Sequence, residues 1–359
     1  LNVKNPYLCI KLLPLIFKNI VIQDFSADSI NADVVYDGKF KLGQYYIDDM
    51  PQSELKLSKA QVMLDKYDLK LNDKVQNKTI IFDGKYLKIN KFADNKRLSL
   101  STSAAIITGN KISHIDYDID LKLPLKNVLN NQLRLSGQIK DLDISDFSEY
   151  IKTLSKNEIK STSGIINIQF TTQKNSYNND VINLFADIQN LAIMRENIKT
   201  SIYSDERLKI EGSFSTINNG ININDFKIST KDIEMFLQGQ VTKLNAKLPQ
   251  LDLKVGVMKS KAEKILALLP ASHDLVPDID LYVLKEAGFW GDASAYLEVK
   301  GKADYPNVFG SVLVKNAYMV QPIPNSEKAT IKLAFKGDKF DLDVKVPTSP
   351  TQTVWVKGP

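Results

Sequence analysis

Apolar and polar residues alternate with a period of two along most of this chain. Residues 251–257 read Leu-Asp-Leu-Lys-Val-Gly-Val, residues 340–346 read Phe-Asp-Leu-Asp-Val-Lys-Val, and residues 117–123 show the same alternation. Successive side chains of a strand point to opposite faces, so each segment predicts a strand with one apolar and one charged face. This pattern is typical of antiparallel sheets, because buried parallel strands are apolar on both faces.

Dipeptides that favour tight turns separate these segments. We expect hairpin turns at Asp37-Gly38, Asp83-Gly84, Asn219-Gly220 and Gly337-Asp338, since such pairs adopt the positive φ angles that hairpins require. The clearest predicted hairpin joins residues 331–335 to residues 340–346.

Two short amphipathic helices interrupt the strand pattern. Apolar residues at near-helical spacing between Ile144 and Leu154 predict the first helix. Ser260 and Glu263 have the spacing of a capping box before an apolar run that Pro270 ends, which predicts the second.

An amphipathic, strand-like sequence pattern with a glycine near its middle or end recurs at residues 133–139, 235–241 and 297–303. Glycine inside a strand often marks a bulge or a bend, and repeated bends would curl a long sheet. We therefore divide the chain into residues 1–155 and 156–285, each ending near a short helix, and residues 286–359, the start of a further repeat. The strands could instead close as two stacked sheets in a sandwich.

Composition supports a folded protein without nucleic-acid binding. Hydrophobic residues make up 43% of the chain, and 47 basic against 42 acidic residues leave a net charge of +5 that is small and scattered. The single cysteine, Cys9, excludes a disulfide within the chain. The sequence contains no run of 18 apolar residues, so it predicts no membrane-spanning helix.

Catalytic chemistry has little support in the sequence. The four Asp-x-Asp pairs, the first of them Asp118 and Asp120, are interpreted as the charged faces of strands. His114 and His273 lack a metal-binding motif, and nucleotide-binding and serine-hydrolase motifs are absent. We therefore predict that the chain is not an enzyme and needs no cofactor or metal.

The segment 291–342 resembles the repeating unit of AsmA/TamB-like proteins. It has a strand that ends in Gly301, then Pro306 and Gly310, then an Asn-Ala pair at 316–317, then a Phe-x-Gly-Asp hairpin at 335–338. Residues 210–270 and 20–40 are also similar to phrases of that family, and a more distant likeness is to chorein-type lipid-transfer proteins.

The resemblance implies a mostly β fold: a long, curled antiparallel sheet that forms an elongated hydrophobic groove. It also implies a periplasmic protein that carries phospholipids between the inner and outer membranes, held at the inner membrane by an anchor outside this sequence. The lipid-facing candidates are Tyr117, Ile119, Leu121, Leu123, Ile221, Ile223, Leu251, Leu253, Val255, Val257, Leu297, Val299, Ile331, Leu333, Phe335, Phe340, Leu342 and Val344.

Other functions remain open at this point. A sheet edge could pair with client β-strands in outer-membrane protein assembly, which would bring assembly proteins as partners. A carbohydrate-binding or adhesin-type sandwich is a further alternative. The chain starts at Leu1 and stops in a strand-like pattern, so we also expect it to be a piece of a longer protein.

Overall fold

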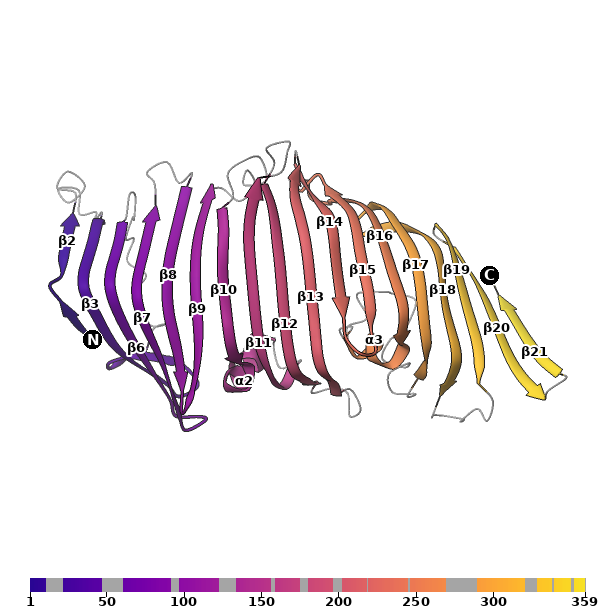
Figure 1. Cartoon of the computed structure of the whole chain (residues 1–359), viewed down its shortest axis with the longest axis horizontal. Helices are drawn as coiled ribbons and strands as arrows, with labels where there is room; N and C mark the ends of the chain where they lie inside the picture. Colours follow the sequence, from indigo (N-terminus) through magenta and orange to yellow (C-terminus); the bar gives the residue numbers. More distant parts are fainter. Residues whose placement is uncertain are drawn as a thin grey trace. The chain divides into compact units, whose positions relative to one another are not determined.

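The computed structural model describes residues 1–10, 22–46, 61–91, 97–122, 134–155, 159–174, 180–195, 202–217, 219–244, 246–268, 289–319, 328–337, 339–349 and 352–358. Most of these residues lie in strands, and the helices are few and short (Figure 1). The predicted mostly β, antiparallel fold with two short helices is therefore confirmed.

The chain divides into two compact units. Unit 1 comprises Leu1–Leu142 with Asn167–Ile182, and unit 2 comprises Asp143–Ile166 with Asn183–Pro359. Strands β11 (Ile159–Lys174) and β12 (Asp180–Arg195) each contribute to both units. The three segments predicted above were defined by recurring sequence patterns, whereas the two units are defined by contacts between residues. The boundaries of the three segments therefore stay a prediction.

Unit 1 is a mostly antiparallel sheet in which the strands from β6 to β10 each pair with the next. Among the pairings described, β3 with β6 is parallel, and β1 and β2 pair with the other edge of β3. Its strands are β1 (Asn2–Lys4), β2 (Tyr7–Ile10), β3 (Ile22–Tyr36), β4 (Phe40–Leu42), β5 (Tyr45–Tyr46), β6 (Gln61–Asp73), β7 (Lys78–Lys91), β8 (Arg97–Thr108), β9 (Lys111–Lys122) and β10 (Arg134–Asp143).

Unit 2 is an antiparallel meander in which the strands from β13 to β21 pair in chain order. Figure 1 shows these strands side by side. They are β13 (Ile202–Ile217), β14 (Gly220–Ser229), β15 (Glu234–Thr242), β16 (Gln250–Lys261), β17 (Phe289–Lys302), β18 (Tyr305–Met319), β19 (Ala329–Gly337), β20 (Phe340–Ser349) and β21 (Gln352–Gly358).

Two of the four predicted turns join strands as expected, at Asp37-Gly38 and Asn219-Gly220. In the turn predicted at Gly337-Asp338, Gly337 ends β19 with φ 83°, and Asp338 lies outside the described residues. The turn predicted at Asp83-Gly84 is wrong, because both residues lie inside β7. Gly84 lies opposite Tyr67 of β6, whose ring occupies the space that a side chain at position 84 would need, 2.0 Å from its Cβ. The glycine therefore makes room for an aromatic ring instead of reversing the chain.

Both predicted helices form. The first is a 3₁₀ turn, η2 (Ile144–Phe147), followed by α2 (Ser148–Leu154), and the Asp143 carboxylate caps it by accepting from the Ser145 N–H at 2.9 Å.

The second helix, α3 (Ala262–Leu268), starts differently from the prediction. Ser260 still belongs to β16, where its hydroxyl accepts from the Glu234 N–H, and the Glu263 carboxylate accepts from the Gly291 N–H. The predicted capping box is therefore wrong, since both side chains bond to neighbouring strands. Pro270 lies outside the described residues.

Fully buried apolar side chains are rare among the described residues. The largest side chains less than 2% exposed are Ile80, Ile233 and Ser260. Among the described residues, short helices are the elements that pack on the sheet, and most apolar side chains of its strands are partly open to solvent. No described helix is both long enough and apolar enough to cross a membrane.

Candidate functional site

The strand register of unit 2 places its predicted apolar residues on one face of the sheet. Residues directly opposite each other in an antiparallel pair share a face, and Leu253 lies opposite Val299 while Leu333 lies opposite Leu342. We call this surface the apolar face of unit 2. It includes Ile221, Ile223, Leu251, Leu253, Val255, Val257, Leu297, Val299, Ile331, Leu333, Phe335, Phe340, Leu342 and Val344.

Rows of apolar side chains cross this face perpendicular to the strands. One row can be followed over six strands without a polar residue: Met235, Val257, Ala295, Val312, Leu333 and Leu342. The alternation seen in the sequence thus becomes a continuous surface, because successive hairpins keep their apolar residues in register.

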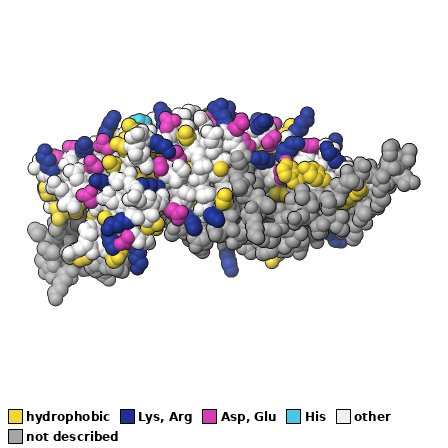
Figure 2. Space-filling model, turned by 90° about the horizontal axis from the view of Figure 1, so that it is seen from below, with side chains coloured by type: hydrophobic (Ala, Val, Ile, Leu, Met, Phe, Trp, Pro, Cys, Tyr) yellow, Lys and Arg dark blue, Asp and Glu magenta, His cyan; other side chains and the backbone are white. Residues whose placement is uncertain are grey.

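The opposite face of the same strands carries charges. Lys254 lies opposite Glu298, and Glu298 also accepts a hydrogen bond from Lys300 at 2.8 Å. Figure 2 shows basic and acidic side chains interspersed over the described surface, without a large region of one sign. Such mixed, exposed pairs solvate the outer face and contribute little to stability.

Short helices cover one end of the apolar face. Ile144 of η2 and Ile233 belong to one buried cluster, and Ala262 of α3 belongs to a second cluster with Ala293 and Ala317. Ile265 of α3 packs against both clusters. This end of the sheet is therefore a closed core, and the predicted lipid-facing residue Ile331 packs against it.

Towards the other end of the strands, no described helix packs on the apolar face. We call this part the uncovered strip and define it by Ile221, Ile223, Leu251, Leu253, Val255, Leu297, Val299, Leu333, Phe335 and Leu342. All are half-buried except Ile223, which is buried. Val257 and Val344 are half-buried too, and the side chain of Phe340 lies outside the described residues. Side chains that touch their sheet neighbours yet remain partly open can contact an apolar ligand.

The remaining candidates lie on the apolar face of unit 1. Ile119 lies opposite Leu135, and Tyr117 lies opposite Gly137 and stacks on Phe170 with ring centroids 6.1 Å apart. Burial raises the pKa of Tyr117. The backbone of Leu121 lies on β9, whereas its side chain and all of Leu123 lie outside the described residues.

Sequence patterns missed several residues of both apolar faces. Ile80 is completely buried on β7, but it sits in an apolar run with Ile81 and Phe82 that hides the alternation. In the run 312–314 of β18, Val312 and Val314 face the apolar side while Leu313 lies opposite Lys332. The register with a neighbouring strand shows which of these side chains lie on the apolar face, whereas the sequence of one strand alone does not.

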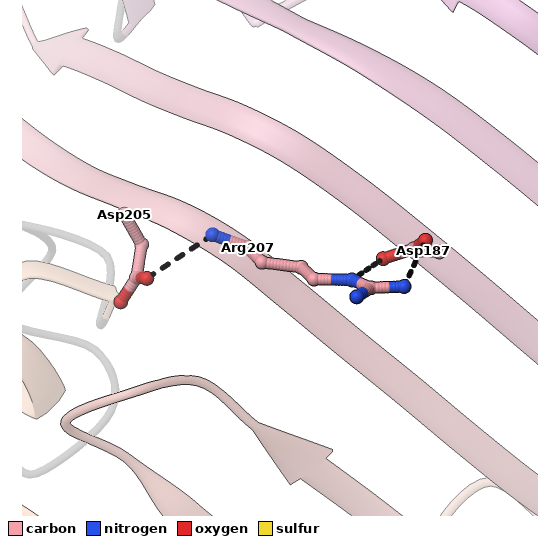
Figure 3. A network of polar contacts seen from close by, with 3 residues as sticks. All are labelled: Asp187, Asp205 and Arg207. Atoms are coloured by element: carbon pink, nitrogen blue, oxygen red, sulfur yellow. Dashed lines mark hydrogen bonds and ion pairs between the residues drawn. The ribbon is translucent and has the colours of Figure 1, made fainter.

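A separate polar network joins β12 and β13 in unit 2 (Figure 3). The Arg207 guanidinium donates to both carboxylate oxygens of Asp187, at 2.7 and 2.9 Å, and its backbone N–H donates to Asp205 at 3.3 Å. These bonds and the positive charge lower the pKa of Asp187. Because Asp187 is buried and already bound at both oxygens, the pair positions two strands rather than a substrate.

Among the described residues, the candidate catalytic side chains of the sequence are not brought together. His114 is exposed on β9, and Asp118 accepts from the Ser101 hydroxyl at 2.8 Å as part of a charged strand face. His273 lies outside the described residues. Within the described ranges, no group of three or more His, Cys, Asp or Glu side chains could hold a metal ion.

No family model matches the chain, and no curated protein or solved structure shows significant similarity to it. Its function must therefore be inferred from its own residues.

Proposed function

We propose that this chain binds the acyl chains of phospholipids on its apolar faces and carries lipids between the inner and outer membranes of a bacterial envelope. The observation that carries the proposal is the in-register uncovered strip of half-buried apolar residues in unit 2. In a closed core these side chains would be fully buried, as Ile233 is.

The energetics favour an extended apolar ligand over a small one. Each buried CH₂ group contributes roughly 0.8 kcal/mol, so an acyl chain of about fourteen carbons gains about 10 kcal/mol before the costs of binding. The rows of the apolar face offer similar side chains at every strand, so no position holds the chain much more tightly than the next. A lipid could therefore move along the sheet.

The resemblance of the sequence to AsmA/TamB-like proteins supports the proposed location and partners. We propose a periplasmic protein that receives phospholipid at the inner membrane, where a segment outside this sequence would hold it. Outer-membrane assembly proteins are further partners under the same proposal.

Mass spectrometry of the purified chain tests this function. The wild-type protein should contain co-purified phospholipid, and the triple variant Leu253→Asn, Val255→Thr, Leu342→Asn should lose at least about four fifths of it. Because these side chains are only half-buried, the urea midpoint of the variant should stay close to that of the wild type.

Two controls make the result decisive. Asp252→Asn, Lys254→Gln and Asp341→Asn change the opposite face of the same strands and should keep the lipid. Ile233→Ser places a hydroxyl in the closed core and should unfold the protein at lower urea. The proposal is contradicted if the purified wild type contains no phospholipid. It is also contradicted if the triple variant unfolds at clearly lower urea than the wild type, as Ile233→Ser is expected to do.

The edges of the two units favour assembly of client β-strands as a second candidate. The edge formed by β1 and β2 is interrupted at Asn5, which has φ 49°, whereas β21 is uninterrupted and pairs, among the described residues, with β20 alone. An uninterrupted edge can accept another strand. A scaffold of this kind would capture unfolded outer-membrane barrel protein in a pull-down while remaining free of lipid.

A further inference from the structure

The exposed aromatic side chains of unit 2 are concentrated on one hairpin, formed by β17 and β18 (Figure 1). Phe185 is the one other exposed aromatic residue in the described part of this unit. Single exposed apolar side chains are ordinary, whereas a group of them marks a surface that contacts another molecule. We call the group on the hairpin the aromatic stripe, and its members are between 37% and 84% exposed: Trp290, Tyr296, Tyr305, Phe309 and Tyr318.

The aromatic stripe lies on the charged face of the sheet, opposite the uncovered strip. Trp290 follows Phe289, which packs in the closed core, and Tyr296 precedes Leu297 of the apolar face. Successive side chains of a strand point to opposite faces, so both aromatic residues point away from the apolar face. The pairing with β18 places the other three residues of the stripe on the same side.

The aromatic rings follow the hairpin along its length. Trp290 and Tyr318 lie opposite each other, with ring centroids 6.1 Å apart and ring planes 13° from parallel. Tyr296 and Phe309 are diagonal neighbours, because Phe309 lies opposite Glu298, the second residue after Tyr296. The step along β17 from Trp290 to Tyr296 spans roughly 20 Å. The stripe is therefore long and narrow, which suits a chain of linked rings better than a single small molecule.

Hydrogen-bonding side chains lie between the aromatic residues. Asp292 comes between Trp290 and Tyr296 on β17, and its carboxylate accepts from Asn316 at 2.8 Å and from Lys261 at 2.6 Å. Further hydroxyl and amide groups on this face belong to Ser294, Asn307 and Ser311. The stripe thus offers flat apolar rings flanked by donors and acceptors.

The aromatic stripe has little charge with which to bind an ion. Its carboxylates, Asp292 and Glu298, are each paired with a lysine, at 2.6 and 2.8 Å, and Lys315 opposite Asp292 adds one further cation. A nucleic acid would need many more cations. Both strands are already paired on each side, so a peptide cannot bind here by adding a strand. These features favour a neutral ligand.

We propose that the aromatic stripe binds a neutral oligosaccharide built of pyranose rings. The C–H bonds on the face of such a sugar carry weakly positive hydrogens, which suit the negative face of an aromatic ring. The hydroxyl groups at the edge of the sugar then bond to Asp292, Asn316 and the two serines. This site lies on the opposite face from the proposed lipid surface and does not depend on it.

Isothermal titration calorimetry of the full chain tests this site with two probes, the hexamers of β-1,4-linked glucose and of β-1,4-linked N-acetylglucosamine. At least one hexamer should bind, and at least about tenfold more tightly than its dimer, because the dimer contacts fewer of the aromatic rings. The double variant W290A, Y296A should weaken the binding of that hexamer at least about tenfold. Raising the salt from 0.01 M to 1 M should change the affinity by less than about twofold, since the ligand is neutral.

The double variant Y86A, F185A is the matched control, because it removes two aromatic side chains of similar exposure, 44% and 40%, outside the stripe. It should bind the hexamer as tightly as the wild type does. W290A, Y296A should keep the urea midpoint of the wild type and the phospholipid that co-purifies with it, since both changes lie on the charged face.

The site is overturned if neither hexamer binds, or if the two double variants weaken binding equally. It is also overturned if the wild type binds no sugar but self-associates in sedimentation, and W290A, Y296A abolishes that association. The stripe would then be a contact between copies of the chain. None of these outcomes bears on the proposed lipid binding, which is measured separately by the phospholipid content.

Discussion

Gly239 of β15 and Gly256 of β16 lie on opposite faces of adjacent strands, and a Cβ atom at either position would clash with its neighbour in the structure. A Cβ atom at Gly239 would lie 2.1 Å from the Asp252 carbonyl oxygen, and one at Gly256 would lie 1.9 Å from the Phe236 ring. Gly239 also has φ +128° and stands opposite the register shift between Ile223 and Phe226. The recurring glycine of the sequence phrase therefore marks a bulge here, as expected.

Gly239→Ala should destabilise the protein by about 2 to 4 kcal/mol, because the new methyl group meets backbone that cannot move away and φ is unfavourable. Urea unfolding measures this difference. Gly109→Ala is the control, since Gly109 has φ +58° but open space around it, and it should cost only about 1 kcal/mol. Equal losses for the two variants would show that the close approach at Gly239 is unimportant.

The pair formed by Asp187 and Arg207 should make stability depend on pH. Because Arg207 lowers the pKa of Asp187 in the folded protein below its unfolded value of about 3.9, the pair contributes fully above that pH. The contribution is lost as the pH falls through the lower, folded value. Asp187→Asn should cost about 1 to 2 kcal/mol at pH 7, and its deficit should shrink below about pH 4.

Urea midpoints of wild type and Asp187→Asn at pH 7, 5, 4 and 3 measure this effect. Arg207→Gln should cost at least as much at pH 7, since it leaves a buried carboxylate without its cation. A deficit of Asp187→Asn that stays constant over this pH range would contradict the role of the ion pair.

At the scale of secondary-structure elements, helix α3 packs against both buried clusters of unit 2. Ile265 contacts the cluster around Ile233 and the cluster around Ala293, which lie on different strands of unit 2. Seven residues are too few to form a stable helix alone, so the helix depends on this packing.

Ile265→Ala should therefore destabilise unit 2 by about 2 kcal/mol through lost contacts on both sides. Lys259→Ala, at an exposed position near the end of β16, should change stability by less than about 0.5 kcal/mol. Denaturant unfolding distinguishes the two. If Ile265→Ala behaves like Lys259→Ala, α3 does not hold the two clusters together.

Local sequence patterns predicted which strands and helices form better than they predicted where each of them begins and ends. Strict alternation at residues 251–257 predicted β16 and its apolar side, because the period of two is a direct consequence of strand geometry. Ser260 and Glu263 matched a capping box only in spacing, and their bonds to Glu234 and Gly291 depend on strands that are distant in sequence. The uncovered strip was predictable as an apolar surface, whereas the part that α3 covers depends on tertiary contacts.

At the scale of the whole molecule, an apolar surface that stays partly open should bind an apolar dye in the native state. We expect 8-anilinonaphthalene-1-sulfonate to fluoresce with the folded protein while its near-ultraviolet circular dichroism and cooperative unfolding are retained. Phospholipid should displace the dye. Fluorescence that appears only after the near-ultraviolet signal is lost would indicate a molten globule and a closed native core.

The chain-order pairing of β13 to β21 has a consequence for how such a protein can change in evolution. Each strand contacts mainly its two neighbours, so stability grows by nearest-neighbour terms as in repeat proteins. Duplication or loss of a whole hairpin keeps both strand direction and the apolar rows in register, whereas loss of a single strand reverses the direction of everything that follows. The length of the sheet can thus be inherited in steps of one hairpin.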